Sequence, residues 1–495
     1  MNTQRQSGIL LHPTSLPGDF GTGNFGPEAF RFVDFLAEAG QTLWQILPLG
    51  PTGPGDSPYQ SFSAFAFNPI LIDLNHFVNK GLIVESDLEE AKCENTGKVD
   101  YAFVNSTRAT IFRKAYQAFL DSAPDQDKMA FDSFCLRHNA WLEDYALFMA
   151  IKDYYDGIAW HQWSLPIRKR ENRAMRNFRQ LLKWEIGYHR FLQFVVNCQW
   201  FYLKAYANDK GIKIIGDIPL YISFDSSDAW AKPEMFMLDR KLKPVLVAGV
   251  PPDFFSETGQ LWGNPVYDWE YQHKTGFRWW IQRMDYNLEM ADIVRIDHFR
   301  GLAAYWAVPY GAETAINGEW LPAPGDALFK ALTRKKGSLP IIAEDLGVIT
   351  PDVDELRNKY GLPGMKILQF GFDKADENPF LPHLYTANSV VYTGTHDNDT
   401  VLGWYSLLDE EDKRKFHDYT GCTNCDVHWQ MIRLALASVS NLAVIPLQDI
   451  MGLGSEARMN IPGTPHSNWQ WRFKDGDLLP EYAEKINLFC KLYNR

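Results

Sequence analysis

Eight short runs of apolar residues recur along the chain, separated by polar and helix-forming stretches. They lie at residues 8–11, 42–47, 212–217, 291–297, 340–344, 365–370, 390–395 and 442–447. Short, continuous apolar runs are typical of strands that are buried on both faces of a parallel sheet. The pattern therefore predicts eight parallel strands.

Helices are predicted between several of these runs. Residues 27–39 carry apolar side chains at helical spacing, with Pro27 in the first turn and Gly40 directly after the last residue. A second helix is expected to begin after Thr350, a good N-cap residue, and to end before Gly361. Strands and helices that alternate eight times predict an α/β fold of the (β/α)8 type, the TIM barrel.

Two long segments interrupt the regular spacing of the predicted strands. Residues 50–211 follow the second strand and are rich in amphipathic helical patterns, whereas residues 218–290 follow the third strand. Within the latter, residues 249–265 are rich in Gly and Pro and are interpreted as a shaped loop. Both segments leave the carboxyl ends of strands, where barrel enzymes keep their active sites. We interpret residues 1–495 as one catalytic barrel unit with large inserted, mainly helical subdomains on that face.

Carboxylates follow four of the predicted strands. Asp297 stands in an Arg-Ile-Asp-His run, Glu344 in Ala-Glu-Asp-Leu-Gly and Asp397 in Thr-His-Asp-Asn, while Asp217 ends the third strand. Four acids at four strand ends are hard to explain as packing, because buried unpaired carboxylates are costly. One carboxylate to attack, one to donate a proton and one to hold the substrate are what glycosidic bond cleavage requires. The pattern favours an enzyme that acts on α-linked sugars.

The local sequence around two of these acids makes further predictions. Arg295 and Asp297 are two residues apart on a strand, so their side chains should point to the same side. A guanidinium there is expected to lower the pKa of Asp297 and keep it ionised, although an isolated pair of this kind would be read as a plain salt bridge. Glu344 and Asp345 are adjacent, so only one can face the barrel mouth, and periodicity alone does not decide which.

Two longer motifs narrow the interpretation. They are SPYQSFSAFAFNP at residues 57–69 and GVPPDFFSETGQLWGNP at residues 249–265. Together with the three acidic signatures they resemble the α-amylase clan and, within it, the amylomaltases, which are 4-α-glucanotransferases or disproportionating enzymes, here of the compact type. The likeness runs from the His-Pro-Thr-Ser-Leu-Pro-Gly run at 12–18 to the Arg-Met-Asn-Ile-Pro-Gly-Thr run at 458–464, nearly the whole chain.

The resemblance implies a role for each acid. Asp297 would be the nucleophile, Glu344 the general acid and base, and Asp397 a residue that binds sugar hydroxyls and favours ring distortion. The resemblance also implies that no metal and no cofactor is needed. The residues that it implies for substrate binding are Ser57, Tyr59, Asp217, Gln260, Trp262, Arg295, Phe370, His396 and Asn460.

Two of these residues are supported by the local sequence as well. Tyr59 and Trp262 each stand among Pro, Gly, Ser and Gln, where no helix or strand pattern would bury them. Aromatic rings pack on the apolar faces of sugars, so both are expected to contact substrate from loops.

Charge and cysteine content limit partners and location. The chain carries 49 Lys and Arg against 61 Asp and Glu, and the net charge of −12 speaks against binding nucleic acid or anionic membranes. The basic run at 168–176 is interpreted as a solvated helix face.

The sequence predicts no membrane span, because it contains no apolar run of about 18 residues. The first residues show no signal segment, so we expect a cytoplasmic protein whose six cysteines are free thiols. Cys422 and Cys425 have the C-x-x-C spacing of zinc and redox sites, but without a second pair or nearby His ligands chance is the favoured interpretation over such a role.

Three functions remain in competition. A glucanotransferase passes an α-1,4-glucan segment, from a maltooligosaccharide, amylose, starch or glycogen, to the 4-OH of another glucan or glucose. A hydrolase of the same clan would pass it to water through the same intermediate. A barrel that binds sugar without activity is disfavoured by the intact set of acids. The motif at 249–265 and the resemblance favour transfer, while cyclic products, chain-length preference, a plastid location and the oligomeric state stay open.

Overall fold

The computed structural model describes residues 5–53, 55–252, 256–372, 378–422, 425–464 and 466–495. Its centre is a sheet of eight parallel strands in the order β10-β11-β12-β1-β2-β3-β6-β9. The eight predicted strands are confirmed, although several are shorter than the apolar runs that predicted them. Their bounds are β1 (Gln6–Leu10), β2 (Leu43–Gln45), β3 (Lys213–Ile218), β6 (Ile293–Ile296), β9 (Ile341–Ala343), β10 (Gly364–Ile367), β11 (Ser389–Tyr392) and β12 (Leu442–Pro446).

Contacts between β9 and β10 close the sheet into a barrel. The Ala343 N–H donates to the Pro363 carbonyl at 2.9 Å. The carboxylate of Asp345, which is 8% exposed, accepts the Met365 N–H at 2.7 Å. Its other oxygen is paired with Arg357 of helix α13 (Pro351–Lys359). Asp345 therefore holds the seam of the barrel, and the expected (β/α)8 fold is confirmed.

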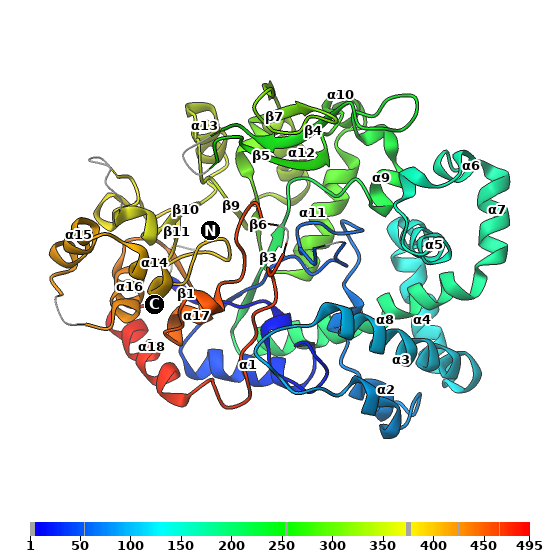
Figure 1. Cartoon of the computed structure of the whole chain (residues 1–495), viewed down its shortest axis with the longest axis horizontal. Helices are drawn as coiled ribbons and strands as arrows, with labels where there is room; N and C mark the ends of the chain where they lie inside the picture. Colours follow the sequence, from blue (N-terminus) through cyan, green and yellow to red (C-terminus); the bar gives the residue numbers. More distant parts are fainter. Residues whose placement is uncertain (1–4, 54, 253–255, 373–377, 423–424, 465) are drawn as a thin grey trace.

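Helices cover the barrel on its outside (Figure 1). The predicted helix at 27–39 is α1, which begins at Pro27 and packs against helices α8 and α18. Helices α8 and α11 pack against β3, and α16 packs against β12. The helices of this layer are α1 (Pro27–Glu38), α8 (Lys183–Asp209), α11 (Arg278–Met290), α12 (Gly325–Lys336), α13, α14 (Val401–Leu407), α15 (Glu410–Thr420), α16 (Val427–Ala437), α17 (Leu447–Ile450) and α18 (Pro480–Leu492).

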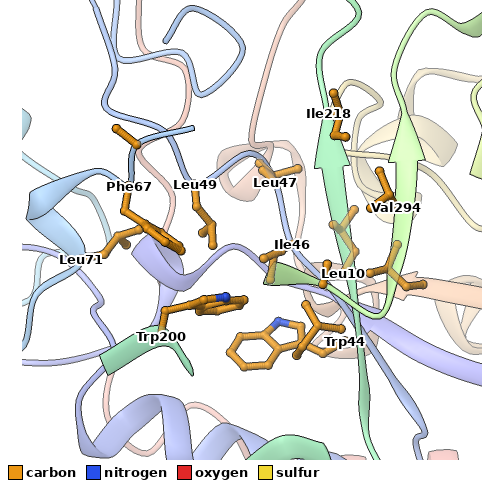
Figure 2. Packing of buried hydrophobic residues seen from close by; sticks show 14 of the residues in the cluster. Leu10, Trp44, Ile46, Leu47, Leu49, Phe67, Leu71, Trp200, Ile218 and Val294 are labelled. Carbon is orange, nitrogen blue, oxygen red and sulfur yellow. The ribbon is translucent and has the colours of Figure 1, made fainter. Parts of the chain in front are cut away.

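Large aromatic side chains fill the space between barrel and helices. Figure 2 shows Trp44 of β2 and Trp200 of α8 among aliphatic side chains such as Leu49. Both tryptophans are fully buried, and their indole N–H groups donate to the carbonyls of Leu11 at 2.8 Å and Met290 at 3.1 Å. Because a buried indole N–H needs an acceptor, these bonds let the rings lie in the core at no polar cost.

The chain between β2 and β3 is mainly helical. Its long helix α8 packs against α3, α4, α5 and α7, which lie to one side of the barrel (Figure 1). These helices are α2 (Asn75–Asn79), α3 (Tyr101–Ser122), α4 (Asp125–Arg137), α5 (Asn139–Tyr154), α6 (Leu165–Arg168) and α7 (Asn172–Leu181).

A second, antiparallel sheet was not predicted. Its strand order is β5-β4-β7-β8, with β4 (Leu246–Val250), β5 (Gln260–Pro265), β7 (Ala304–Pro309) and β8 (Glu319–Pro322). The chain before it forms the short helix α9 (Ser227–Ala231), and α10 (Trp269–Lys274) follows β5.

The sheet corrects the interpretation of 249–265 as a loop, because both ends of that segment are paired strands. Its middle, residues 253–255, lies outside the described residues. Gly249 is required here, since a Cβ would stand 2.5 Å from the Gln260 carbonyl. The glycine that suggested a loop is thus what allows the two strands to approach.

The cysteines depart from expectation at one pair. Cys422 and Cys425, which follow α15, form a disulfide, whereas Cys93, Cys135, Cys198 and Cys490 are free. The two Cα atoms lie 6.1 Å apart, within the range that a disulfide spans. The prediction of six free thiols is therefore wrong for this pair.

Among the helices that the structure describes, none has the length and apolar character of a membrane span.

The barrel seam generates the first prediction. Asp345→Asn should destabilise the folded protein by about 2 kcal/mol, because it removes a charged partner from Arg357 at a buried site. Asp354→Asn is the matched control, because Asp354 is the other carboxylate paired with Arg357 and its side chain is 49% exposed. This substitution should lower the free energy of unfolding by under about 0.5 kcal/mol. Thermal unfolding of both variants measures the difference. Equal losses, or an Asp345→Asn protein that is folded but inactive, would contradict the assignment of Asp345 to the seam.

Candidate active site

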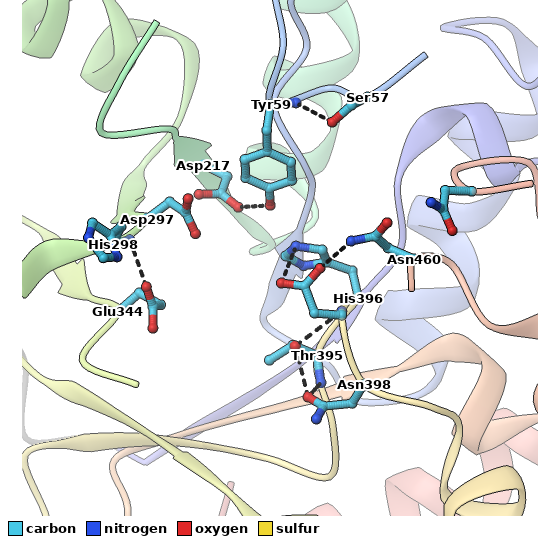
Figure 3. A network of polar contacts seen from close by, with 12 residues as sticks. Ser57, Tyr59, Asp217, Asp297, His298, Glu344, Thr395, His396, Asn398 and Asn460 are labelled. Atoms are coloured by element: carbon cyan, nitrogen blue, oxygen red, sulfur yellow. Dashed lines mark hydrogen bonds and ion pairs between the residues drawn. The ribbon is translucent and has the colours of Figure 1, made fainter. Parts of the chain in front are cut away.

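The predicted acids gather at the carboxyl ends of the barrel strands. Asp217 lies in β3, Asp297 directly follows β6, Glu344 directly follows β9, and Asp397 comes after β11. In Figure 3, Asp297 and Glu344 lie on one side of Tyr59, and His396 lies on the other. The barrel thus brings together residues that are far apart in the sequence.

A buried arginine connects two of the acids. Arg295 is 3% exposed, and its Nη1 contacts both carboxylate oxygens of Asp217, at 2.9 and 2.8 Å. Its Nη2 reaches Asp297 Oδ1 at 2.9 Å, as the spacing of two residues on a strand predicted. Tyr59 adds a fourth member, because its hydroxyl donates to Asp217 Oδ2 at 2.7 Å. Asp297 is 29% exposed at its side chain, so this chain of contacts ends in a carboxylate that a ligand can reach.

Burial sets the charge state of this site. It raises the pKa of Asp297 to about 8; Arg295 opposes the shift, while the carboxylates of Glu344, Asp217 and Asp397 add to it. The expectation that Arg295 would leave Asp297 with a lowered pKa is therefore wrong, since desolvation outweighs the ion pair. Burial also raises the pKa of Glu344. Because Glu344 contributes to the raised pKa of Asp297, the two carboxyl groups titrate as a pair.

The structure decides between the two adjacent acids. Glu344 accepts backbone N–H bonds from His298 at 2.6 Å and Leu346 at 2.8 Å, so both of its oxygens are held beside Asp297. Asp345 faces the opposite way, toward Arg357 and the barrel seam. Glu344 is therefore the residue of the pair that belongs to the site.

Asp397 is held by a second set of contacts. Asn460 Nδ2 donates to its Oδ1 at 2.6 Å, and His396 Nε2 lies 3.4 Å from its Oδ2. Thr395 and Asn398 fix the turn, because Asn398 Oδ1 accepts the N–H and the hydroxyl of Thr395, both at 2.9 Å (Figure 3). Burial lowers the pKa of His396, which is thus neutral at pH 7. The Asp397 side chain is 44% exposed and open to a ligand.

Tyr59 lies between the two sets of contacts. Its ring stacks on His396, with centroids 5.2 Å apart and planes at 16°. Ser57 Oγ accepts the Tyr59 N–H at 3.3 Å and shapes the turn that presents the ring. Tyr59 is half-buried, so it is more enclosed than the composition of its loop predicted.

Gln260 and Trp262 lie on β5, not in a loop as expected. Trp262 Nε1 donates to Gln260 Oε1 at 3.2 Å, and the Trp262 ring meets His298 edge-on at 4.8 Å. His298 was quoted as part of a motif but was not predicted as a site residue. It adopts a left-handed backbone (φ 51°), and its Nε2 is buried without a partner among the described residues. Its position directly after Asp297 is the signal that could have found it.

Phe370 stands apart from this network in the described part of the chain. It lies in the 3-10 helix Leu368–Phe372 after β10, and its ring packs edge-on against Phe380 at 5.3 Å. Among the residues that the structure describes, no group of three or more His, Cys, Asp or Glu is arranged to hold a metal ion.

Known structures share this architecture. The amylomaltase from Streptococcus agalactiae, solved in complex with acarbose, superposes with a TM-score of 0.96 at 43% identity, and the match covers 99% of this chain and 100% of that one. The amylomaltase from Corynebacterium glutamicum has a TM-score of 0.79 at 18% identity and covers 99% of this chain and 75% of that one. At such low identity the second match shows the fold alone.

Sequence comparison places the chain more closely. The 4-alpha-glucanotransferase of Synechocystis sp. is 51% identical over 499 residues, covering 100% of this chain and 99% of the relative. That of Thermus thermophilus is 49% identical over 503 residues, covering all of both chains. A family model described as 4-alpha-glucanotransferase matches residues 11–478. Because the family model covers most of the chain and full-length relatives share about half of its residues, this protein belongs to the 4-alpha-glucanotransferase family.

Proposed function

We propose that the protein transfers segments of α-1,4-glucan from one chain to the 4-OH of another glucan or of glucose, by a retaining double displacement at Asp297 and Glu344. One observation carries the proposal. A partly exposed carboxylate, Asp297, is fixed by a buried arginine beside a second carboxylate, Glu344, that is held by two backbone N–H groups. This is the pair of groups that a retaining enzyme needs.

In the first step, Asp297 attacks the anomeric carbon of the donor while Glu344 gives its proton to the departing glycosidic oxygen. This division of roles requires an ionised Asp297 and a protonated Glu344, and the raised pKa of Glu344 favours its protonated form. Arg295 contacts Asp297 directly at 2.9 Å and so favours the negative charge there. The products are a glucosyl ester on Asp297 and a shortened glucan with a free 4-OH.

In the second step, Glu344 removes the proton from the 4-OH of an acceptor, whose oxygen attacks the anomeric carbon and releases Asp297. This reverses the first step with a different glucan, and Glu344 ends protonated as it began. Asp397 is proposed to bind the hydroxyls of the reacting sugar, with His396 and Asn460 holding its carboxylate. Such contacts assist distortion of the sugar ring toward the transition state.

The remaining predicted residues are proposed to bind the substrate. Tyr59, with Ser57 and Asp217, would line the donor sugar, because the three are joined by hydrogen bonds beside Asp297. Gln260 and Trp262 would line the acceptor, since the Trp262 ring reaches the residue that follows the nucleophile. Phe370 is proposed as a further substrate contact on the resemblance alone.

The wider assignments remain proposals as well. Maltooligosaccharides, amylose and glycogen are the proposed substrates, supported by the family and by acarbose in a solved relative. Residues 50–211 and 218–290 are proposed as subdomains inserted into one catalytic unit, and the cytoplasm as its location.

The reaction type can be measured with maltotriose. Each transfer breaks one α-1,4 bond and makes another, so glucose and a ladder of longer oligosaccharides should form while the number of reducing ends stays constant. Total reducing sugar and free glucose are followed together over time. Reducing sugar that rises in step with glucose would identify a hydrolase instead.

The roles of the two acids can be separated with an activated donor. Asp297→Asn and Glu344→Gln should each lower turnover of maltotriose by about 10³-fold or more, because each removes one half of the double displacement. With a glycosyl fluoride, whose leaving group needs no proton, Glu344→Gln should still accumulate an adduct on Asp297 that peptide mass spectrometry detects. Asp345→Asn is the control and should turn over normally. An adduct on Asp345 or Asp397, or none at all, would contradict the assignment.

The raised pKa values predict a shifted pH profile. When the pH rises past the raised pKa values of Glu344 and of Asp297, which is about 8 for Asp297, the pair loses its protons, so the general acid is lost and kcat/KM should fall. At low pH the pair gains a second proton and the nucleophile is lost. The alkaline fall should disappear for Glu344→Gln acting on the fluoride donor, since no acid is needed there. A kcat/KM for wild type that is flat between about pH 6 and pH 10 would contradict this account.

A further inference from the structure

The segment 466–472 contacts the site through Trp469 and is anchored outside it. Its backbone is bonded to residues 97–99, where the Val99 N–H donates to the Gln470 carbonyl at 2.7 Å and the Arg472 N–H donates to the Gly97 carbonyl at 3.0 Å. These partners directly precede α3. The segment is therefore tied to the chain that follows β2 and, through the Trp471 carbonyl and the Arg472 side chain, to residues 15–18 after β1.

Trp469, in the middle of this segment, has an uncommon backbone. Its φ of 63° is in the left-handed region, which a residue with a bulky side chain rarely adopts. Two hydrogen bonds hold it there: the Trp469 N–H donates to the Met459 carbonyl, and the Tyr101 hydroxyl donates to the Trp469 carbonyl, both at 2.7 Å. The surroundings thus impose a conformation that the residue would not choose alone.

This conformation aims the Trp469 ring at two site residues. The ring is 6% exposed and lies 5.7 Å from the Tyr59 ring and 5.8 Å from the His396 ring, at angles of 44° and 38°. Tyr59 and His396 also stack on each other, so the three rings form one cluster. Pairs at such distances attract one another beyond simple burial.

The polar ends of the two partner rings touch different acids. Tyr59 donates to Asp217 at 2.7 Å, and through Arg295 this contact leads to Asp297. His396 lies 3.4 Å from Asp397 on the other side. The Trp469 ring therefore packs against both Tyr59 and His396, the two residues that contact the acids on either side.

We propose that Trp469 is a positioning residue for the transfer reaction, whose strained backbone presses its ring against Tyr59 and His396 and thereby sets the orientation of both. The proposal rests on the proposed function and adds to it a residue that acts on the acids through Tyr59 and His396. Without the ring, Tyr59 and His396 would lose their support, and the donor sugar would be bound in a less reactive orientation. Small misplacements of this kind reduce rate strongly.

The test compares two tryptophans of the same segment. Trp469→Leu should lower kcat/KM for maltotriose by about 100-fold, mostly through kcat, whereas Trp469→Phe keeps a ring and should restore most of it. Trp471→Leu is the matched control, because Trp471 is 8% exposed and its ring pairs with Phe473 at 6.4 Å. It should lower the unfolding temperature as much as Trp469→Leu but leave kcat/KM within about threefold of wild type.

A spectroscopic measurement separates positioning from stability. In protein labelled with ¹³C at histidine Cε1, the His396 signal, assigned with His396→Asn, should shift in Trp469→Leu and stay in place in Trp471→Leu, because ring currents and ring orientation change only in the first. Unchanged kcat/KM in a folded Trp469→Leu protein, or equal losses in both leucine variants, would overturn the proposal.

Tyr101→Phe gives an independent test if Trp469→Leu does not fold. Loss of the hydroxyl that holds the Trp469 carbonyl should lower kcat/KM by about fivefold and shift the His396 signal. A wild-type rate and an unmoved signal would also overturn the proposal. Wild type that fails to build the maltotriose ladder would instead disprove the transfer reaction, so the two failures can be told apart.

Discussion

The ion pair of Arg295 with Asp217 is the interaction on which the site depends. A guanidinium that is 3% exposed could not remain in the barrel unpaired, because a buried charge needs a partner and hydrogen bonds. Asp217, whose side chain is fully buried, supplies both through its two oxygens. The two residues face each other in the register of β3 and β6. That register leaves the second guanidinium nitrogen free to reach Asp297, so the pairing of two strands determines where the proposed nucleophile stands.

The rest of the site is supplied by chain that leaves the barrel. Tyr59 comes from the segment after β2, Trp262 from the small antiparallel sheet and Trp469 from a segment near the C-terminus. Tyr59 bonds directly to Asp217 and stacks on His396. Trp262 contacts the ring of His298, and Trp469 contacts the rings of Tyr59 and His396. Rigid rings with few rotatable bonds can fix geometry at low cost in conformational entropy. The barrel thus holds the carboxylates, and aromatic contacts align the inserted segments with them.

Burial has two opposite effects in this arrangement. It strengthens the contacts between charged groups, since they are screened less by water, and it disfavours the charged form of each acid. Asp297 shows both effects, because it contacts Arg295 and still has a pKa of about 8. Raised pKa values help the Asp297–Glu344 pair to retain a proton, which suits a reaction in which one group must be ionised and the other protonated.

The sequence by itself determined the order of the strands along the chain, the acids at their ends and the family. Continuous apolar runs identify buried parallel strands, and a carboxylate after such a run must lie at the carboxyl end of the barrel. The tertiary structure alone decided that Glu344 and not Asp345 faces the site, because a period of two alternates sides without saying which is inward. It also decided the pKa of Asp297 and the contacts of Trp469, since desolvation and ring packing depend on neighbours from distant segments. These effects depend on residues that come close only in the folded chain, so local sequence does not reveal them. Strand periodicity, by contrast, is visible in local sequence.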